Sequence, residues 1–311
     1  MVTILSKSDK LVFYAFIPLV VSVLGLFIVM SLFITYQSAP SLIRFGMDLL
    51  SSTVWRPADD PELEKYGLLA PVVGSLYVSV LATLITFPLS VTLTFTITEI
   101  LHKRLREFLR SIVEIMGGLP TVVYGLWGST VLAPYLRDFI MQPLYDHLGF
   151  IPIFSCKPVS GYSILTASLV LAIASTPYVT ALLIEGYNMI PAKYKEGIIC
   201  LGATKYETFK LLYGLLKPYV IASLLLSLSR ALGETTIVAL TVGNAMKLTL
   251  CLFDSTHTIP SLIASQFESA RLYTYAMPTL FAGGLLLLLI SLGASYVGIK
   301  KMYDWRSKIH V

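Results

Sequence analysis

Two ionisable residues, Arg230 and Glu234, lie within a long apolar stretch that covers residues 219–243. A charged side chain at the centre of a membrane helix costs about 2.5–3.5 kcal/mol on insertion scales, so such residues are functional candidates. Their spacing of four places them on one helix face, where they can form an ion pair. We expect this face to line a helix bundle or a wet cavity on a transport path. An ion pair that only fixes packing is the alternative.

The composition indicates the kind of protein that holds such a pair. The chain has 311 residues, of which 56% are hydrophobic and only 13% are charged. Its mean hydropathy is +0.77. These values exclude an ordinary soluble domain and indicate a polytopic membrane protein. The net charge of +5 follows the placement of basic residues between apolar runs, so it does not indicate nucleic-acid binding.

Five other stretches lack Asp, Glu, Lys and Arg for longer than the roughly 20 residues that a helix needs to cross a bilayer. With 219–243 they predict six transmembrane helices in an all-α polytopic membrane protein. A short N-terminus, 1–10, precedes a single transmembrane domain, 11–311. The expected spans are about 11–36, 71–98, 111–136, 160–186, 219–243 and 276–300.

The basic residues predict the orientation of these spans. Fifteen of the 23 Lys and Arg residues lie in the N-terminus, in 101–110, in the loop 187–218 and in the C-terminal tail. The three segments on the opposite side contain seven. Because cytoplasmic loops carry the excess of Lys and Arg, both termini and the loop 187–218 are expected to be cytoplasmic. The protein is expected in the cell membrane, in contact with lipid.

The third expected span contains several helix breakers. Gly117, Gly118 and Pro120 predict a break or bend, and small residues allow close contact between helices. A broken helix at membrane depth can direct backbone N–H groups at an anion. The hydroxyls of Thr121 and Tyr124 are possible donors there, with ordinary packing as the alternative for both.

The sequence lacks the motifs of the common enzymes. It contains no GxxxxGK phosphate loop, no HExxH and no GxSxG, and its four histidines do not have metal-ligand spacing. We therefore expect neither an enzyme nor a metal site. Cys156 and Cys251 lie on the same predicted outer side, where a disulfide between them is a hypothesis. Cys200 lies on the reducing inner side.

The cytoplasmic loop 187–218 is long for a connection between two spans. Its residues predict two short helices separated by Gly202, and Pro191 suits the first turn of the first helix. A helical elbow at this place is typical of a docking element that passes a partner's movement to the spans. A passive interfacial helix is the alternative.

Three stretches of the chain resemble a known family. The loop sequence KEGIICLGATKYETF resembles the EAA loop of ABC-importer permeases, in which a Glu is followed six residues later by a Gly, here Glu196 and Gly202. The stretches SRALGETTIVALTVGNA and LPTVVYGLWGSTVLAP resemble permeases of the phosphate-specific transport system. The TVGN and VVYGLWG segments look more like its C-type subunit than its A-type. Gly197 and the late Pro218 depart from the usual loop pattern.

The resemblance implies a type I ABC-importer permease fold and an assembly of several subunits. This chain would pair with a second, similar permease, and a dimer of cytoplasmic ATPase subunits would dock on the loops. An extracytoplasmic phosphate-binding protein would deliver the substrate. ATP would be used by the partner ATPase, with no cofactor bound by this chain. Residues implied in the transport path are Arg230, Glu234, Thr235, Thr121 and Tyr124, and those implied in ATPase coupling are Glu196, Gly202, Ala203 and Thr204.

Two alternatives remain open at this point. An ABC permease for another oxyanion or solute, such as molybdate or sulfate, would share the loop and the spans. An ion-coupled secondary transporter or a membrane scaffold would need no ATPase. Competition among oxyanions separates the first from phosphate transport, and co-purification of an ATP-hydrolysing subunit excludes the second.

Overall fold

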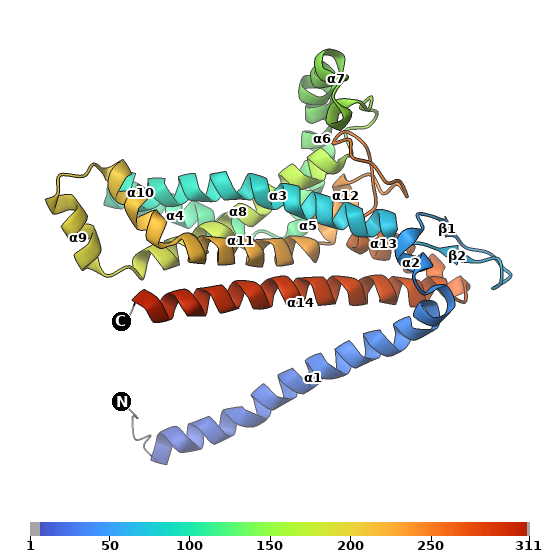
Figure 1. Ribbon diagram of the computed structural model, residues 1–311, viewed down its shortest axis with the longest axis horizontal. Coiled ribbons are helices and arrows are strands. Elements are labelled where there is room, and N and C mark those ends of the chain that lie inside the picture. The colour runs from blue at the N-terminus through green and yellow to red at the C-terminus, as the bar shows by residue number, and fades with distance from the viewer. Residues whose placement is uncertain (1–6, 310–311) are drawn as a thin grey trace.

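The computed structural model describes residues 7–309, and most of them form helices that run side by side (Figure 1). Four segments are long and apolar enough to cross a membrane. Two bent helix pairs, Lys103–Gly118 with Thr121–Leu148 and Lys205–Leu215 with Lys217–Leu232, raise the possible number to six. The four are α1 (Lys7–Phe45), α3 (Leu69–Phe95) with its extension η1 (Thr96–Ile100), α8 (Ile164–Asn188) and α14 (Ala276–Ile309). They match four of the six expected spans.

The bundle has two different ends. The beginning of α1, the end of α14 and the helix α9 (Ala192–Cys200) lie toward one end, which we call the α9 end (Figure 1). At the opposite end β1 (Trp55–Arg56) pairs antiparallel with β2 (Lys65–Tyr66), next to α2 (Asp48–Ser51) and α13 (Ile259–Gln266). We call this the hairpin end.

A buried carboxylate fixes the hairpin to the last long helix. Glu64 is 2% exposed, and its two oxygens accept the backbone N–H groups of Thr274 and Tyr275, each at 3.0 Å. These donors lie just before α14, where N–H groups have no partner within the helix. Glu64 therefore ties the connection after α1 to the start of α14.

The first and last helices of the chain pack on each other. The hydroxyls of Ser41 and Thr279 are 2.8 Å apart, and the rings of Phe33 and Phe281 meet edge to face at 5.9 Å. Figure 1 shows α1 and α14 meeting near the hairpin end and separating toward the α9 end. Most side chains described on α1 are apolar and exposed, as lipid allows.

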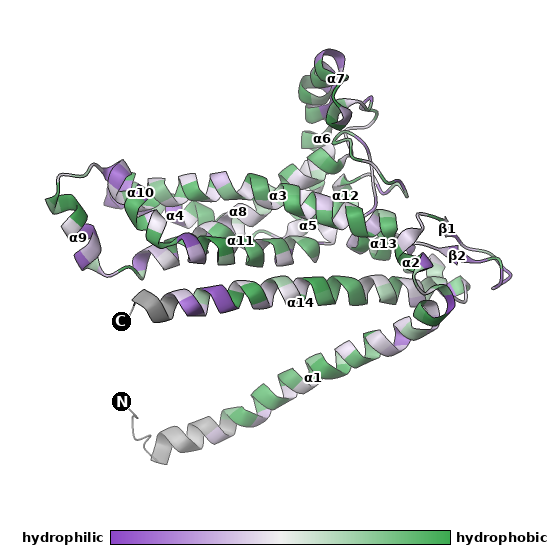
Figure 2. Ribbon diagram, in the orientation of Figure 1, coloured by the Kyte–Doolittle hydropathy of each residue, from purple (hydrophilic) through white to green (hydrophobic). Residues whose placement is uncertain are grey.

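Polar and apolar residues are distributed as lipid requires. Apolar residues extend along the long helices, whereas hydrophilic residues gather at α9, α10 (Lys205–Leu215) and the hairpin (Figure 2). Between α3 and α8, in contrast, buried hydroxyls connect the helices. Thr86 and Ser90 donate to carbonyls of α8, and Ser168 donates to the Val78 carbonyl of α3, over 3.2–3.3 Å. Interhelical hydrogen bonds of this kind are common in membrane bundles.

The expected third span is not one straight helix. The helix α4 (Lys103–Gly118) ends at Gly118, Leu119 is extended, and Pro120 precedes α5 (Thr121–Trp127). The segment Thr121–Leu148 is bent by 91° relative to α4, which confirms the predicted break. It continues through η2 (Gly128–Leu132), α6 (Ala133–Leu136), η3 (Arg137–Met141) and α7 (Gln142–Leu148), which projects from the bundle in Figure 1.

The expected fifth span is also broken, and this break was not predicted. The helix α11 (Lys217–Leu232) ends before Gly233, and α12 (Thr236–Thr241) begins after Thr235. Gly is a weak helix former. The local side chains also bind the backbone: Thr235 Oγ1 donates to the Gly233 carbonyl at 3.4 Å, and Glu234 Oε1 accepts the Ile237 N–H at 3.5 Å.

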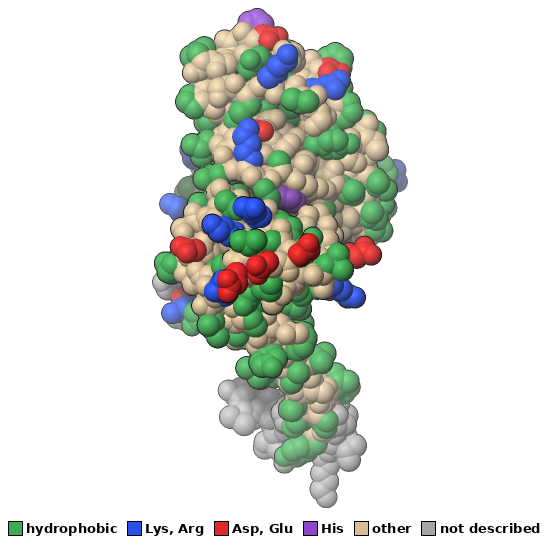
Figure 3. Space-filling view, turned by 90° about the vertical axis from the view of Figure 1, so that its right-hand side faces the viewer, with side chains coloured by type: hydrophobic (Ala, Val, Ile, Leu, Met, Phe, Trp, Pro, Cys, Tyr) green, Lys and Arg blue, Asp and Glu red, His purple; other side chains and the backbone are tan. Residues whose placement is uncertain are grey.

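Charged side chains of both signs meet on the hairpin end. Figure 3 looks onto this end and shows a band of acidic side chains with basic ones around it. The turn between β1 and β2 carries three exposed acidic residues, Asp59, Asp60 and Glu62. This polar surface belongs to the connection between α1 and α3.

The structure also bears out the cysteine hypothesis. Cys156 and Cys251 form a disulfide, with their Cα atoms 6.1 Å apart and a separation of 95 positions in the sequence. The bridge joins the short helix η4 (Pro152–Phe154) to the connection that follows α12, where Phe154 stacks on Phe253. Cys200 is a free, exposed thiol.

These three cysteines give a direct chemical test. Alkylation of freshly purified, denatured protein should modify one cysteine, Cys200, without reductant and three after reduction, because thiols but not disulfides react. Mass spectrometry of the intact protein counts the added groups. Three modifications without reductant would contradict the bridge, and Cys200→Ser should lower each count by one.

Candidate functional site

The two helix breaks lie against each other. Gly125 of α5 packs on the first turn of α12, where a Cβ added to Gly125 would lie 3.3 Å from the Thr236 carbonyl oxygen and 2.7 Å from Leu240. At Gly128 an added Cβ would meet Val170 and Thr241. These glycines allow α5 and η2 to approach α12 and α8 closely, as expected for small residues in membrane bundles.

Arg230 lies beside this junction, in the last turn of α11. Its guanidinium carbon is 5.1 Å from the centre of the Tyr178 ring, a cation–π distance. Tyr178 follows Pro177, which lies near the middle of α8, and a Cβ added to Gly117 at the end of α4 would be 3.4 Å from Pro177. Arg230 and both breaks therefore lie beside the middle of α8.

The pairing expected between Arg230 and Glu234 is wrong. The helix ends at Leu232, so the two residues do not share a helix face. Among the described side chains the structure forms the ion pairs Arg110–Glu114, Arg137–Asp138, Lys195–Glu99 and Lys247–Asp254, and neither Arg230 nor Glu234 is in any of them. Arg230 is instead exposed on the surface of the single chain, while Glu234 is half-buried in the break.

The three hydroxyl residues expected in the path have different surroundings. Thr121 is the first residue of α5 and is half-buried, and Thr235 is exposed directly before α12. Tyr124 is only 8% exposed, and its hydroxyl donates to the Met116 carbonyl at 2.8 Å. This bond connects α5 back to α4 across the bend, so Tyr124 stabilises the break.

The residues expected to couple to an ATPase form a helical elbow, which we define as α9, the turn at Gly202 and α10. Gly202 has φ +81°, a left-handed conformation that favours glycine. Thr204 caps α10: its hydroxyl accepts the Glu207 N–H, while Glu207 accepts the Thr204 N–H. This capping box fixes the start of α10.

The surface of the elbow is suited to contact with a protein. Glu196 is exposed on α9 and Ala203 is half-buried in the turn. Beside them Leu201 is 89% exposed and Ile199 is 52% exposed. Exposed apolar side chains within a charged segment are typical of an interaction surface.

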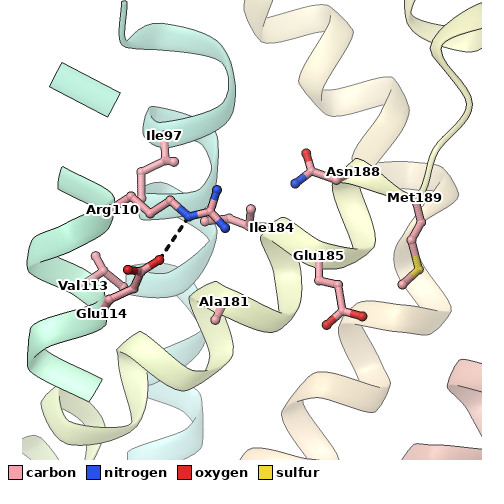
Figure 4. Close-up of a pocket in the computed structure, with 9 residues that line it drawn as sticks. All are labelled: Ile97, Arg110, Val113, Glu114, Ala181, Ile184, Glu185, Asn188 and Met189. Atoms are coloured by element: carbon pink, nitrogen blue, oxygen red, sulfur yellow. Dashed lines mark hydrogen bonds and ion pairs between the residues drawn. The ribbon is translucent and has the colours of Figure 1, made fainter. Parts of the chain in front are cut away.

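A pocket of about 430 Å³ lies between α4 and the last turns of α8, the part of α8 nearest to α9 in the chain (Figure 4). Arg110 and Glu114 of α4 line one side and form an ion pair of 3.2 Å. Glu185 and Asn188 of α8 lie on the other side, and Ile97 of η1 also contributes. The pocket therefore has charged walls within a region of apolar helices.

Sequence reasoning missed several of these residues. Tyr178 contacts the Arg230 guanidinium, yet nothing in the sequence marks it beyond its place after Pro177. Glu99 stands at the end of an apolar run and is the second such residue. It is buried and paired with Lys195 of α9, 96 residues later, a contact that no local pattern indicates.

Comparison with known proteins decides the class of the chain. The family model for the inner membrane component of binding-protein-dependent transport systems matches residues 90–299. The chain belongs to this family. The matched residues begin in α3 and end in α14, so they include both breaks, Arg230 and the elbow. As an inner membrane component of a transport system, the chain is a multi-pass permease subunit and not an enzyme.

Individual relatives of this permease subunit extend over most of its length. A probable phosphate transport system permease protein PstC of Methanocaldococcus jannaschii is 43% identical over 94% of this chain and 93% of its own. The phosphate transport system permease protein PstC of Xylella fastidiosa Temecula1 is 35% identical over 78% of this chain and 75% of its own. That of Haemophilus influenzae is 33% identical over 86% and 85%.

Proposed function

We propose that this permease subunit belongs to an ATP-driven importer of phosphate and forms half of its transport path. The observation that carries the proposal is the 43% identity, over 94% of the chain, to a relative named as a phosphate transport permease. The exposed Arg230 beside the middle of α8 supports an anionic substrate, because a cation within the membrane attracts anions. A charged side chain at this place also costs free energy, which makes a functional role the expected reason for its presence.

The proposed topology has six crossings, a type I fold and both termini in the cytoplasm. Four long helices and two bent pairs support this number. The gathering of α9, the beginning of α1 and the end of α14 at one end supports a shared side for the termini and the elbow (Figure 1). The excess of Lys and Arg in these segments supports a cytoplasmic position for the α9 end.

The proposed path lies between this chain and a second, similar permease. Arg230 and Thr235 are exposed on the single chain, where lipid would be a poor environment for a guanidinium. A second permease against this surface would enclose them in a wet interface. Arg230 then attracts the anion, while Thr235 and Thr121 offer hydroxyls and Glu234 limits the strength of binding so that the anion is released.

The elbow is the proposed docking element for a cytoplasmic ATPase dimer. In this proposal ATP is used by the ATPase and not by this chain. The shape and surface of the elbow depend on Glu196, Gly202, Ala203 and Thr204. The charged hairpin end is the proposed contact for an extracytoplasmic phosphate-binding protein. The pocket between α4 and α8, at the cytoplasmic end in this orientation, is a suitable exit for the substrate.

Transport by the reconstituted complex tests the function. The chain is purified with a second permease and the ATPase, placed in vesicles with the binding protein, and assayed for uptake of labelled phosphate. We expect uptake that requires ATP and that excess sulfate or molybdate does not reduce. Preferential uptake of another oxyanion would assign a different substrate, and uptake driven by an ion gradient without the ATPase would contradict the proposal.

A further inference from the structure

A buried carboxylate at the end of α3 binds the first helix of the elbow. Glu99 lies in η1, a π-helical extension of α3, and its side chain is 6% exposed. Its Oε1 atom accepts a hydrogen bond from the Lys195 ammonium of α9 at 2.5 Å. The same oxygen accepts one from the Tyr187 hydroxyl of α8 at 2.6 Å. Three segments of the chain therefore meet at one oxygen atom.

The surroundings of this contact make it strong and directional. Lys195 also lies 5.8 Å from the centre of the Tyr187 ring, and its own side chain is 39% exposed. A hydrogen-bonded ion pair with one partner buried is screened less by water than a surface pair. π-helical turns occur frequently at functional sites, where they redirect a side chain.

The two helices of the elbow are attached to the bundle by different means. On α10, Phe209 is buried and packs against Phe95 of α3 and Tyr187 of α8, with ring centres 4.8 and 5.7 Å apart. On α9 no described residue is buried. Its contacts with the bundle come from Lys195 and from the half-buried Ile198, one turn further along the same face.

We infer that the Lys195–Glu99 ion pair is the connection through which displacement of α9 is passed to α3 and α8. The inference depends on the proposed coupling of the elbow to an ATPase. A force on α9 acts on Glu99 through the ion pair, and Tyr187 transfers it to the end of α8. The apolar packing of α10, in contrast, holds the elbow in place. Lys195 and Glu99 are thus positioning residues that do not touch the substrate.

The variant Lys195→Met tests this inference in the reconstituted complex. Met keeps the apolar stem of the side chain but cannot donate to Glu99. We expect the ATPase to co-purify and hydrolyse ATP within about twofold of wild type, while phosphate transported per ATP falls about tenfold, within the usual range of coupling between sites. Lys195→Arg, which keeps the charge, should restore most of the ratio.

The matched control is Lys193→Met on the same helix. Lys193 is exposed, and its ammonium lies over the neighbouring Tyr194 ring, so this change should leave both hydrolysis and transport unchanged. An unchanged ratio in Lys195→Met would overturn the inference, and so would loss of the ATPase from the complex, which indicates a purely structural role. Failure of the wild-type complex to transport phosphate would instead contradict the proposed function.

Discussion

Replacing Arg230 with Gln should reduce phosphate uptake by about 100-fold or more while the complex still assembles. The guanidinium is exposed near the middle of the bundle and rests on Tyr178. Gln keeps much of the length but removes the charge, and a loss of about 2.7 kcal/mol of anion stabilisation corresponds to a 100-fold change in rate. Initial uptake of labelled phosphate into vesicles measures this effect, with co-purification of the ATPase as the check on assembly.

A second arginine provides the control for this substitution. Arg271, in η5 (Ser269–Leu272), also lies over an aromatic ring, with its guanidinium carbon 5.2 Å from the centre of Phe267. Because Arg271 lies at the hairpin end, the proposed contact for the binding protein, uptake is compared at a saturating concentration of that protein. Arg271→Gln should then leave uptake within about twofold of wild type, because one exposed charge contributes little. Arg230→Lys should retain part of the uptake, since the charge remains. Wild-type uptake by Arg230→Gln would exclude Arg230 from the path.

Replacing Gly202 with Val should weaken binding of the ATPase by about tenfold. The residue has φ +81°, and a side chain in this region costs about 1–2 kcal/mol, with β-branched residues least tolerated. No atom lies within 4 Å of an added Cβ, so the effect would come from the backbone alone. The turn would relax and change the angle between α9 and α10. Titration of purified permease complex with the ATPase measures the change in affinity.

Two variants separate backbone strain from loss of a contact surface. Gly202→Asn should bind the ATPase nearly as wild type does, because Asn tolerates the left-handed region. Gly197→Ala, within α9, also places a methyl group in open space but at a helical position, so it should have little effect. Equal losses in Gly202→Asn and Gly202→Val would contradict a role for the left-handed turn.

Much of the fold follows from the sequence because lipid imposes simple requirements. Every backbone polar group must be satisfied within the membrane, so a long apolar run has to be helical. This requirement predicted α1, α3, α8 and α14. The bend after α4 was also predicted, because Gly117, Gly118 and Pro120 follow one another. The elbow was predicted from Pro191 and Gly202, whose preferred backbone angles act locally.

The arrangement of the site was only partly predictable. The spacing of Arg230 and Glu234 indicates an ion pair only if the helix continues, and the break at Gly233 removes that condition. Tyr178, beside Arg230, and Glu99, beside Lys195, are distant in sequence from their partners. Such contacts depend on how the helices pack against one another. No local pattern in the sequence specifies this packing.

The contact between α1 and α14 has a consequence for how the protein is made. The ribosome releases α1 first, but the residues that meet Ser41 and Phe33 belong to the last helix of the chain. During synthesis α1 must therefore remain in the bilayer without this neighbour. Its mostly apolar surface makes that delay tolerable. Emergence of α14 is then the step that brings the C-terminal part of α1 against the start of α14 at the hairpin end (Figure 1).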